Sequence, residues 1–154
     1  MPFWKIYHSS NTLTQEDKST LSASITQFYI SVGLPAFYVN VFFLPLTSDN
    51  FFVGGTPQSQ KLSIEIVHVA RQWDSTRTAG ATNFKNKVDE ILRPYTIDKG
   101  VQVEYCVVQG PPQLWRINGI DPPEGSEDEV LRERNRALLE ESVKTSTFLK
   151  TTEK

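Results

Sequence analysis

The sequence predicts an α/β fold built from two fused β-α-β units, with the helices packed on one face of the sheet. Two observations indicate this fold. The order strand–helix–strand occurs twice, with a connecting segment between the two copies. Parallel strands joined by a helix form a right-handed unit, so two such units account for the repeated order. With 154 residues, 38% hydrophobic and 22% charged, the composition is that of a globular protein rather than a disordered one.

The first unit is predicted from residues 3–44. Residues 3–8 are rich in aromatic and β-favouring side chains and predict a strand. Thr14 followed by Asp17 is a variant of the capping box that begins a helix, and Gly33 and Pro35 end that helix. The apolar residues between them have helical spacing: Leu21, Ile25, Phe28, Tyr29 and Val32.

A second strand completes this unit. Residues 38–44 are so apolar that we expect a strand buried on both faces, closed by Pro45. Residues 51–53 before Gly54 and Gly55 predict a short strand that ends in a tight turn.

The second unit repeats the pattern. Residues 62–69 alternate between apolar and polar side chains and predict a strand, and residues 73–81 are polar and typical of a loop. An amphipathic helix stopped by Pro94 follows, and residues 101–108 predict the last main strand. The apolar positions of this helix are Phe84, Val88, Ile91 and Leu92.

The C-terminal part has a different character. Residues 114–119 predict one more short strand or hairpin arm, and Pro122-Pro123 marks a boundary. We therefore expect one domain over residues 1–123 and a charged extension over 124–154. A helix is predicted within 127–143, and the polar end is expected to fray.

Charge and composition exclude several functions. The net charge is −2 without a run of Lys or Arg, which disfavours nucleic-acid and membrane-surface partners. No apolar stretch is long enough to span a membrane, and the first residues do not resemble a secretory signal, so we expect a cytoplasmic protein.

Cys106 is the single cysteine and is expected to be a buried small hydrophobe. His8 and His68 lack metal-ligand spacing, so both are interpreted as structural and no metal is expected.

Pro2 is the most informative candidate for catalysis. Removal of Met1 would expose a secondary amine on a rigid ring, and an α-amino group titrates near pH ~8. Burial disfavours the protonated form, so the amine could be neutral near physiological pH and transfer a proton. The alternative is that Pro2 merely follows the initiator residue. If Met1 stays in place, the nitrogen is an amide and cannot act as a base.

Other residues could complete a site. Arg71 lies just past the end of a predicted strand, where ligand sites are common. Its guanidinium could bind a carboxylate through two hydrogen bonds. From position alone, a surface ion pair is an equal alternative. Arg77 is a weaker candidate. Tyr105 shares a strand face with apolar residues, which favours core packing, although a buried phenol needs a polar partner. Trp115 and Arg116 could line a pocket mouth or, more readily, an interface.

Taken together, these residues resemble the tautomerase superfamily. Pro2 at the start of a strand, two β-α-β units, the sequence Phe-Val-Gly-Gly at 52–55, Arg71 and Tyr105 carry the resemblance. It is greatest to the cis-3-chloroacrylic acid dehalogenase-like branch, whose chains are double-length fusions of the 4-oxalocrotonate tautomerase unit. Residues 114–123 resemble a signature of uncharacterised fungal members. The resemblance covers about residues 2–123.

The resemblance implies a homotrimer whose pockets form around Pro2 and are completed by a neighbouring subunit. It implies that Pro2 is the acid/base, that Arg71 binds a substrate carboxylate, and that Tyr105 is the active-site tyrosine. It also implies that no metal or organic cofactor is needed. Tyr29, Trp115 and Arg116 are expected to bind substrate.

The chain departs from this branch at three positions. Tyr29 stands where the branch has a histidine, and Asp74 where it has a second arginine. Trp115 or Arg116 stands near the position of a water-activating glutamate, and residues 109–120 contain no carboxylate. Hydration or hydrolytic dehalogenation would lack its general base. Keto–enol tautomerisation needs only Pro2 and a cationic clamp.

Three hypotheses follow. The first is a cofactor-independent tautomerase or isomerase acting on a small 2-keto acid or its enol. The second is a hydratase or dehalogenase acting on a short unsaturated acid. The third is a trimeric binding protein without catalytic activity, which a retained Met1 would favour.

Overall fold

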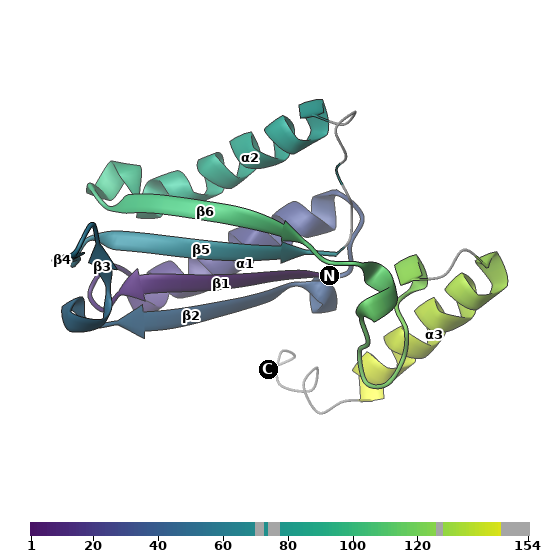
Figure 1. Cartoon of the computed structure of the whole chain (residues 1–154). Coiled ribbons are helices and arrows are strands. Elements are labelled where there is room, and N and C mark those ends of the chain that lie inside the picture. Colours follow the sequence, from purple (N-terminus) through teal and green to yellow (C-terminus); the bar gives the residue numbers. More distant parts are fainter. Residues whose placement is uncertain (70–72, 74–77, 126–127, 146–154) are drawn as a thin grey trace. The chain divides into compact units, whose positions relative to one another are not determined.

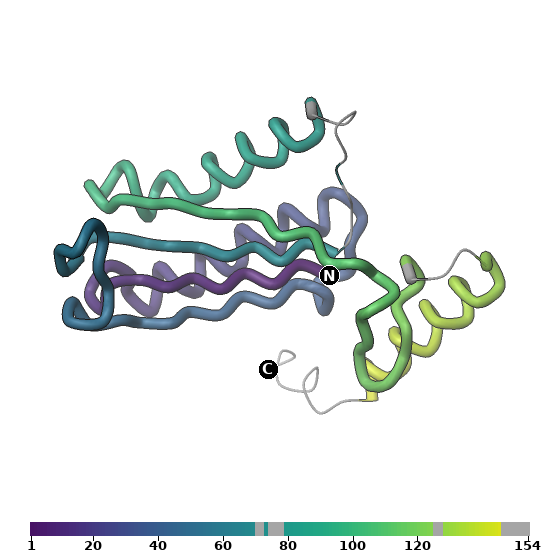
Figure 2. Tube along the Cα trace, in the orientation of Figure 1, coloured from purple at the N-terminus to yellow at the C-terminus, as the bar shows by residue number. Residues whose placement is uncertain are grey.

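The computed structural model describes residues 1–69, 73, 78–125 and 128–145 (Figures 1 and 2). The chain divides into two compact units, Met1–Val108 and Gln109–Lys154, which are considered separately below. The first unit ends before the predicted boundary at residue 123. That boundary stays a prediction.

The first unit contains a four-stranded sheet in the order β2-β1-β5-β6. β1 (Pro2–Ser9) pairs in parallel with β2 (Asn40–Leu46) and antiparallel with β5 (Lys61–His68). β6 (Gln102–Gln109) lies next to β5 and runs in the same direction (Figure 1). Each parallel pair is connected through a helix, so the prediction of two fused β-α-β units is confirmed.

Both helices of this unit pack on the same face of the sheet, here called the helix face. Trp4 of β1 lies opposite Ile66 of β5, and Ile6 lies opposite Ile64, so alternate residues of both strands point to this face. α1 (Gln15–Ser31) and α2 (Thr78–Leu92) supply the other wall of the core. The buried helix residues of this core are Leu21, Ile25, Tyr29, Phe84, Val88, Ile91 and Leu92.

Local signals set the ends of the helices. Thr14 and Asp17 form the predicted capping box, and α1 ends where Gly33 takes a φ of +91°. α2 begins at Thr78, inside the segment predicted to be a loop. It ends at Leu92, where a 3-10 turn containing Pro94 (η3, Arg93–Tyr95) continues the chain.

β2 differs from its prediction because it is an edge strand. Its side chains are half-buried or exposed rather than buried on both faces. The strand begins at Asn40, after a 3-10 turn (η1, Ala36–Tyr38), and it continues through Pro45. An edge strand tolerates proline because one side of its backbone needs no partner.

A small hairpin follows β2 after a 3-10 turn (η2, Ser48–Asn50). β3 (Phe52–Val53) pairs with β4 (Thr56–Pro57) in an antiparallel arrangement. Gly54 and Gly55 make the turn with φ values of +57° and +79°, which glycine adopts without steric cost. The predicted short strand and tight turn are therefore confirmed.

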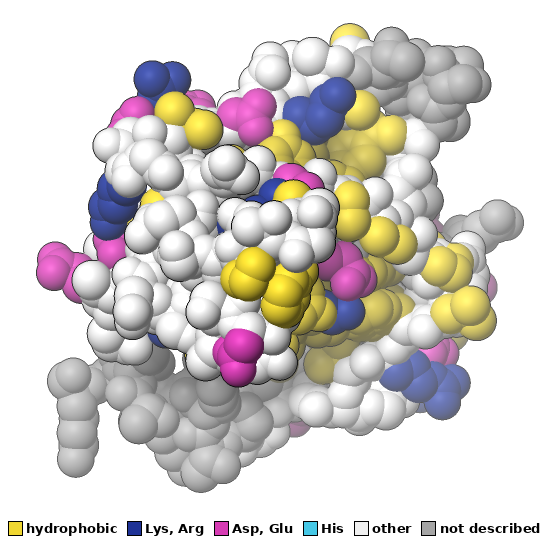
Figure 3. Space-filling view, turned by 60° about the vertical axis from the view of Figure 1, so that its left-hand side comes forward, with side chains coloured by type: hydrophobic (Ala, Val, Ile, Leu, Met, Phe, Trp, Pro, Cys, Tyr) yellow, Lys and Arg dark blue, Asp and Glu magenta, His cyan; other side chains and the backbone are white. Residues whose placement is uncertain are grey.

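The opposite side of the sheet, here called the open face, carries apolar side chains without a covering helix of this unit. Phe3 stacks on Phe42 with ring centroids 6.1 Å apart, and Lys5 pairs with Glu65 at 3.2 Å. Figure 3 shows hydrophobic side chains on the molecular surface, with acidic and basic groups among them. Cys106 was predicted to be buried, but it is exposed. Side chains alternate along β6, so Tyr105 points toward the core and Cys106 points to the other side of the sheet.

The second unit has few regular elements. Residues 114–119 form no strand; Ile117 and Ile120 make an isolated bridge around a turn at Asn118 and Gly119. The 3-10 turns η5 (Pro112–Leu114) and η6 (Pro123–Gly125) lie in contact, and η6 also contacts α3 (Glu129–Thr145). α3 confirms the predicted helix. In the described ranges, no helix is both long enough and apolar enough to span a bilayer.

Candidate functional site

A cavity of about 290 Å³ lies in the first unit between the helices and the end of β5. Its volume is at the small end of ligand pockets, and most of its lining is aromatic or aliphatic. The lining residues are Phe28, Tyr29, Val32, Leu34, His68, Trp73, Gly80, Asn83 and Phe84.

Four segments bring these residues together. The last turn of α1 and the residues after it carry the first wall, and the first turns of α2 carry the second. His68 ends β5, and Trp73 lies against the first turn of α2. A Cβ atom on Gly80 would stand 3.3 Å from Trp73 Nε1, so glycine at this position allows the indole to lie close to the helix.

The rings of the cavity pack on each other. The His68 imidazole stacks on the Trp73 indole at 4.7 Å between centroids, and Trp73 lies 5.0 Å from Phe84. Phe28 lies 5.7 Å from Phe84 and 5.0 Å from Tyr29. These separations are those of favourable tilted and stacked aromatic pairs, so each ring supports its neighbours.

Tyr29 is the buried polar group of this wall. Trp4 Nε1 donates a hydrogen bond to the Tyr29 hydroxyl oxygen at 3.2 Å, and the tyrosine is only 1% exposed. Burial raises the pKa of Tyr29, while the bond from Trp4 opposes this effect. The phenol therefore stays protonated at neutral pH and can donate a hydrogen bond but is a poor base.

Pro2 begins β1 and is buried next to this cavity. It lies opposite His68 in the β1–β5 register, and His68 lines the cavity. Pro2 itself is not a lining residue. Met1 is present, and its carbonyl oxygen accepts a hydrogen bond from the Val69 N–H at 3.1 Å. The Pro2 nitrogen is then a peptide amide, and removal of Met1 is required before it can act as a base.

Arg71, Asp74 and Arg77 lie outside the described residues. The predicted carboxylate clamp therefore stays a prediction from the sequence. Val69, the last described residue before this segment, follows β5 directly.

Tyr105 packs against the core on the helix face, as predicted from the apolar residues on its side of the strand. It does not line the cavity of its own chain. Its hydroxyl donates to an Asp89 carboxylate oxygen at 2.8 Å and lies 3.2 Å from the Lys85 carbonyl. Desolvation, and then the bond to Asp89, raise the pKa of Tyr105. Its role as the active-site tyrosine stays a prediction.

Trp115 and Arg116 belong to the second unit. Trp115 is half-buried, whereas Arg116 is exposed and donates from Nε to Asp121 at 2.6 Å. The bond to Asp121 raises the pKa of Arg116, so its charge is engaged locally. The structure thus places Tyr29 at the cavity and gives Arg116 an acidic partner of its own.

Sequence reasoning missed most of the cavity wall. It correctly placed Trp73 outside helices and strands and Phe84 on a helix, but it gave neither residue a site role, and it interpreted His68 as structural. Asn83 and Gly80 carried no signal in the sequence. Only the predicted order of elements indicates that the C-terminal end of α1 and the start of α2 lie near the end of β5. Among the described residues, no group of three or more His, Cys, Asp or Glu could hold a metal.

Comparison with known proteins places this geometry in a known fold. A family model named Tautomerase_3 and described as "Putative oxalocrotonate tautomerase enzyme" matches residues 1–136. A probable enzyme from the thermophilic fungus Aspergillus fumigatus is 41% identical, with 88% of this chain and 94% of that chain covered at a TM-score of 0.73. RhCC from Rhodococcus jostii RHA1 is 29% identical, with 88% and 95% covered at a TM-score of 0.74. The search of curated proteins finds no match.

More distant structures share the fold alone. N1, a member of the cis-3-chloroacrylic acid dehalogenase family, is 13% identical, with 88% of this chain and 99% of that chain covered at a TM-score of 0.63. A fused 4-OT protein that forms an asymmetric trimer is 19% identical, with 77% and 94% covered at a TM-score of 0.57. The resemblance inferred from the sequence is confirmed.

Proposed function

This chain belongs to the Tautomerase_3 family of putative oxalocrotonate tautomerases, and from that premise we propose that it is a cofactor-independent tautomerase of a small 2-keto acid or its enol. The proposal rests chiefly on Pro2. This residue is buried at the start of β1 and lies opposite His68, which lines the aromatic cavity.

Pro2 acts as the acid and base once Met1 is removed. Its neutral ring nitrogen takes the proton from the enol oxygen, and the carbonyl forms as the electrons of the C=C bond move to C3. The protonated nitrogen then gives a proton to C3, which yields the keto acid and restores the amine. Apolar burial favours the neutral amine at the start of this cycle.

Cationic groups bind the substrate carboxylate in this proposal. Arg71 follows β5 in the sequence and is the first candidate, with Arg116 the second. Either guanidinium would stabilise the negative charge that develops during proton transfer. Tyr29, Tyr105 and Trp115 shape the rest of the pocket, with Tyr105 supplied by a neighbouring subunit of a homotrimer.

The described lining of the cavity offers no carboxylate base for hydration. Hydration or hydrolytic dehalogenation needs a carboxylate or another base that activates water. None of the described residues that line the cavity is acidic. Tyr29 stays protonated and does not replace that base.

The test is a Pro2→Ala variant assayed with the enol form of phenylpyruvate. We expect kcat/KM to fall at least about a hundredfold, the contribution of one positioned acid/base group. Pro111→Ala, an exposed proline of the second unit, is the matched control and should retain the parent rate. Equal rates for Pro2→Ala and the parent, or an intact mass that includes Met1 in active protein, would contradict the proposal.

A further inference from the structure

We propose that the cavity is a subsite for a planar aromatic group, so that the preferred substrate is a 2-keto acid bearing an aryl substituent. The inference rests on the proposed function for the 2-keto acid part of the substrate. The preference for an aromatic group rests on the cavity alone, so binding of unreactive compounds can test it without any measurement of catalysis.

The volume and lining of the cavity fit one aromatic ring. Apolar cavities of about 150 Å³ bind benzene, and this cavity has about 290 Å³. Its polar groups are few: the Asn83 amide, the His68 imidazole and the Tyr29 hydroxyl. A short acid such as a chloroacrylate would leave most of this apolar wall in contact with water, whereas an aryl group would cover it.

The aromatic rings of the cavity hold one another in place. Trp73 stacks on His68 and packs against Phe84, and Phe84 packs against Phe28. Because neighbouring rings fix each other, a ligand does not have to order them. A planar group entering the cavity would meet aromatic faces and edges, which it can contact in stacked or tilted geometry.

Gly80 controls the position of the Trp73 wall. A Cβ on residue 80 would meet the indole at 3.3–3.4 Å, which is tight, and a longer side chain would displace Trp73 or occupy the cavity. Gly80 is exposed on α2, so a larger residue there is compatible with the helix. The residue at position 80 therefore determines specificity.

In the sequence, the predicted carboxylate clamp lies close to a residue of the subsite. Arg71 precedes Trp73 by two residues, so one short segment of chain would supply both the cation and an aromatic wall. Pro2 lies opposite His68 at the same end of the sheet.

The experiment compares two unreactive acids, 3-phenylpropionate and propionate, by isothermal titration calorimetry on the full-length protein. We expect the phenyl compound to bind at least about tenfold more tightly, because burial of an aromatic ring gains apolar contact. Gly80→Leu should abolish this preference, and Ala79→Leu, at the adjacent exposed position outside the lining, should keep it. Val32→Trp fills the cavity from the α1 side and serves as a second test should Gly80→Leu fail to fold.

The outcomes separate this inference from the proposed function. Equal binding of the two acids by the parent protein, or an unchanged preference in both cavity-filling variants when folded, overturns the aromatic subsite. A Pro2→Ala variant that loses turnover but keeps the preference supports both proposals. A parent protein that tautomerises no enol but still prefers the phenyl compound overturns the proposed function and leaves the subsite standing.

Discussion

His8 is a polar side chain that the sheet buries completely. It is 0% exposed, and its Nδ1 donates to the Ser9 carbonyl at 2.9 Å. Among the described residues, its Nε2 has no hydrogen-bond partner. A charged imidazole would leave a second N–H unpaired in the core, so the folded state holds the neutral form.

This burial predicts a pH-dependent stability. Burial lowers the pKa of His8, and the nearby Lys18 charge adds to that effect, while the Ser9 carbonyl opposes it. The unfolded chain binds the proton more readily, so the contribution of neutral His8 is complete above pH ~6.5 and is lost as the pH falls through the folded-state pKa.

The measurement is urea unfolding of the parent and of His8→Phe between pH 7 and pH 5, at a fixed protein concentration. The parent should lose stability toward pH 5 more steeply than the variant. Asp17 does not interfere, because its pKa lies below the ordinary 3.8 and outside this range. Parallel pH profiles for the two proteins would show that His8 is not held neutral.

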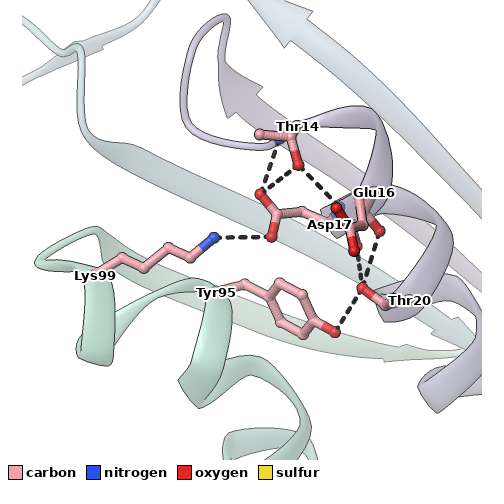
Figure 4. A network of polar contacts seen from close by, with 6 residues as sticks. All are labelled: Thr14, Glu16, Asp17, Thr20, Tyr95 and Lys99. Carbon is pink, nitrogen blue, oxygen red and sulfur yellow. Dashed lines mark hydrogen bonds and ion pairs between the residues drawn. The ribbon is translucent and has the colours of Figure 1, made fainter.

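At the scale of elements, a polar network ties the start of α1 to the turns that follow α2 (Figure 4). The Asp17 carboxylate accepts from the Thr14 N–H at 2.9 Å, and Lys99 donates to it at 2.8 Å. Tyr95 donates to the Thr20 hydroxyl at 3.0 Å. The bond to Lys99, followed by that to Thr14, lowers the pKa of Asp17.

This network makes Asp17 a stabilising residue. Asp17→Ala removes half of the capping box and the partner of Lys99, and we expect the free energy of unfolding to fall by about 1–2 kcal/mol at pH 7. Glu16→Ala, in the same turn, is the matched control with an expected change below about 0.5 kcal/mol. Urea unfolding measures both. If Asp17→Ala lowers the free energy of unfolding no more than Glu16→Ala does, the network does not stabilise the fold.

At the scale of the whole molecule, the open face predicts assembly. Phe42 of the edge strand β2 is 46% exposed and stacks on Phe3 of β1. Apolar patches of this kind mark interfaces more often than free surface. A homotrimer that covers the open face would remove these side chains from water.

Phe42→Glu tests this assembly because it places a charge on the open face. We expect the trimer to dissociate and the tautomerase rate to fall with it, since the predicted pocket is shared between subunits. Phe52→Glu, on the exposed hairpin strand β3, should leave both the mass and the rate unchanged. Light scattering after size-exclusion chromatography gives the mass. A parent protein that is monomeric and active would contradict the predicted assembly.

The sequence by itself determined features that depend on near neighbours. The capping box at Thr14 and Asp17 and the glycine turn at 54–55 were predicted because each needs only contacts a few residues apart. The two β-α-β units followed from side-chain periodicity. Pro2 was singled out because the chemistry of a proline after the initiator residue is visible in the chain, whereas Tyr29 was named only through the resemblance to the tautomerase superfamily.

Only the tertiary structure decided which faces are covered and where a cavity forms. β2 became an edge strand and Cys106 an exposed residue, because strand order and pleat direction depend on partners far along the chain. The cavity combines α1, the end of β5, Trp73 and α2, four segments whose meeting no local pattern encodes. The packing of these segments against one another gives Trp73, Gly80 and Phe84 their proposed role.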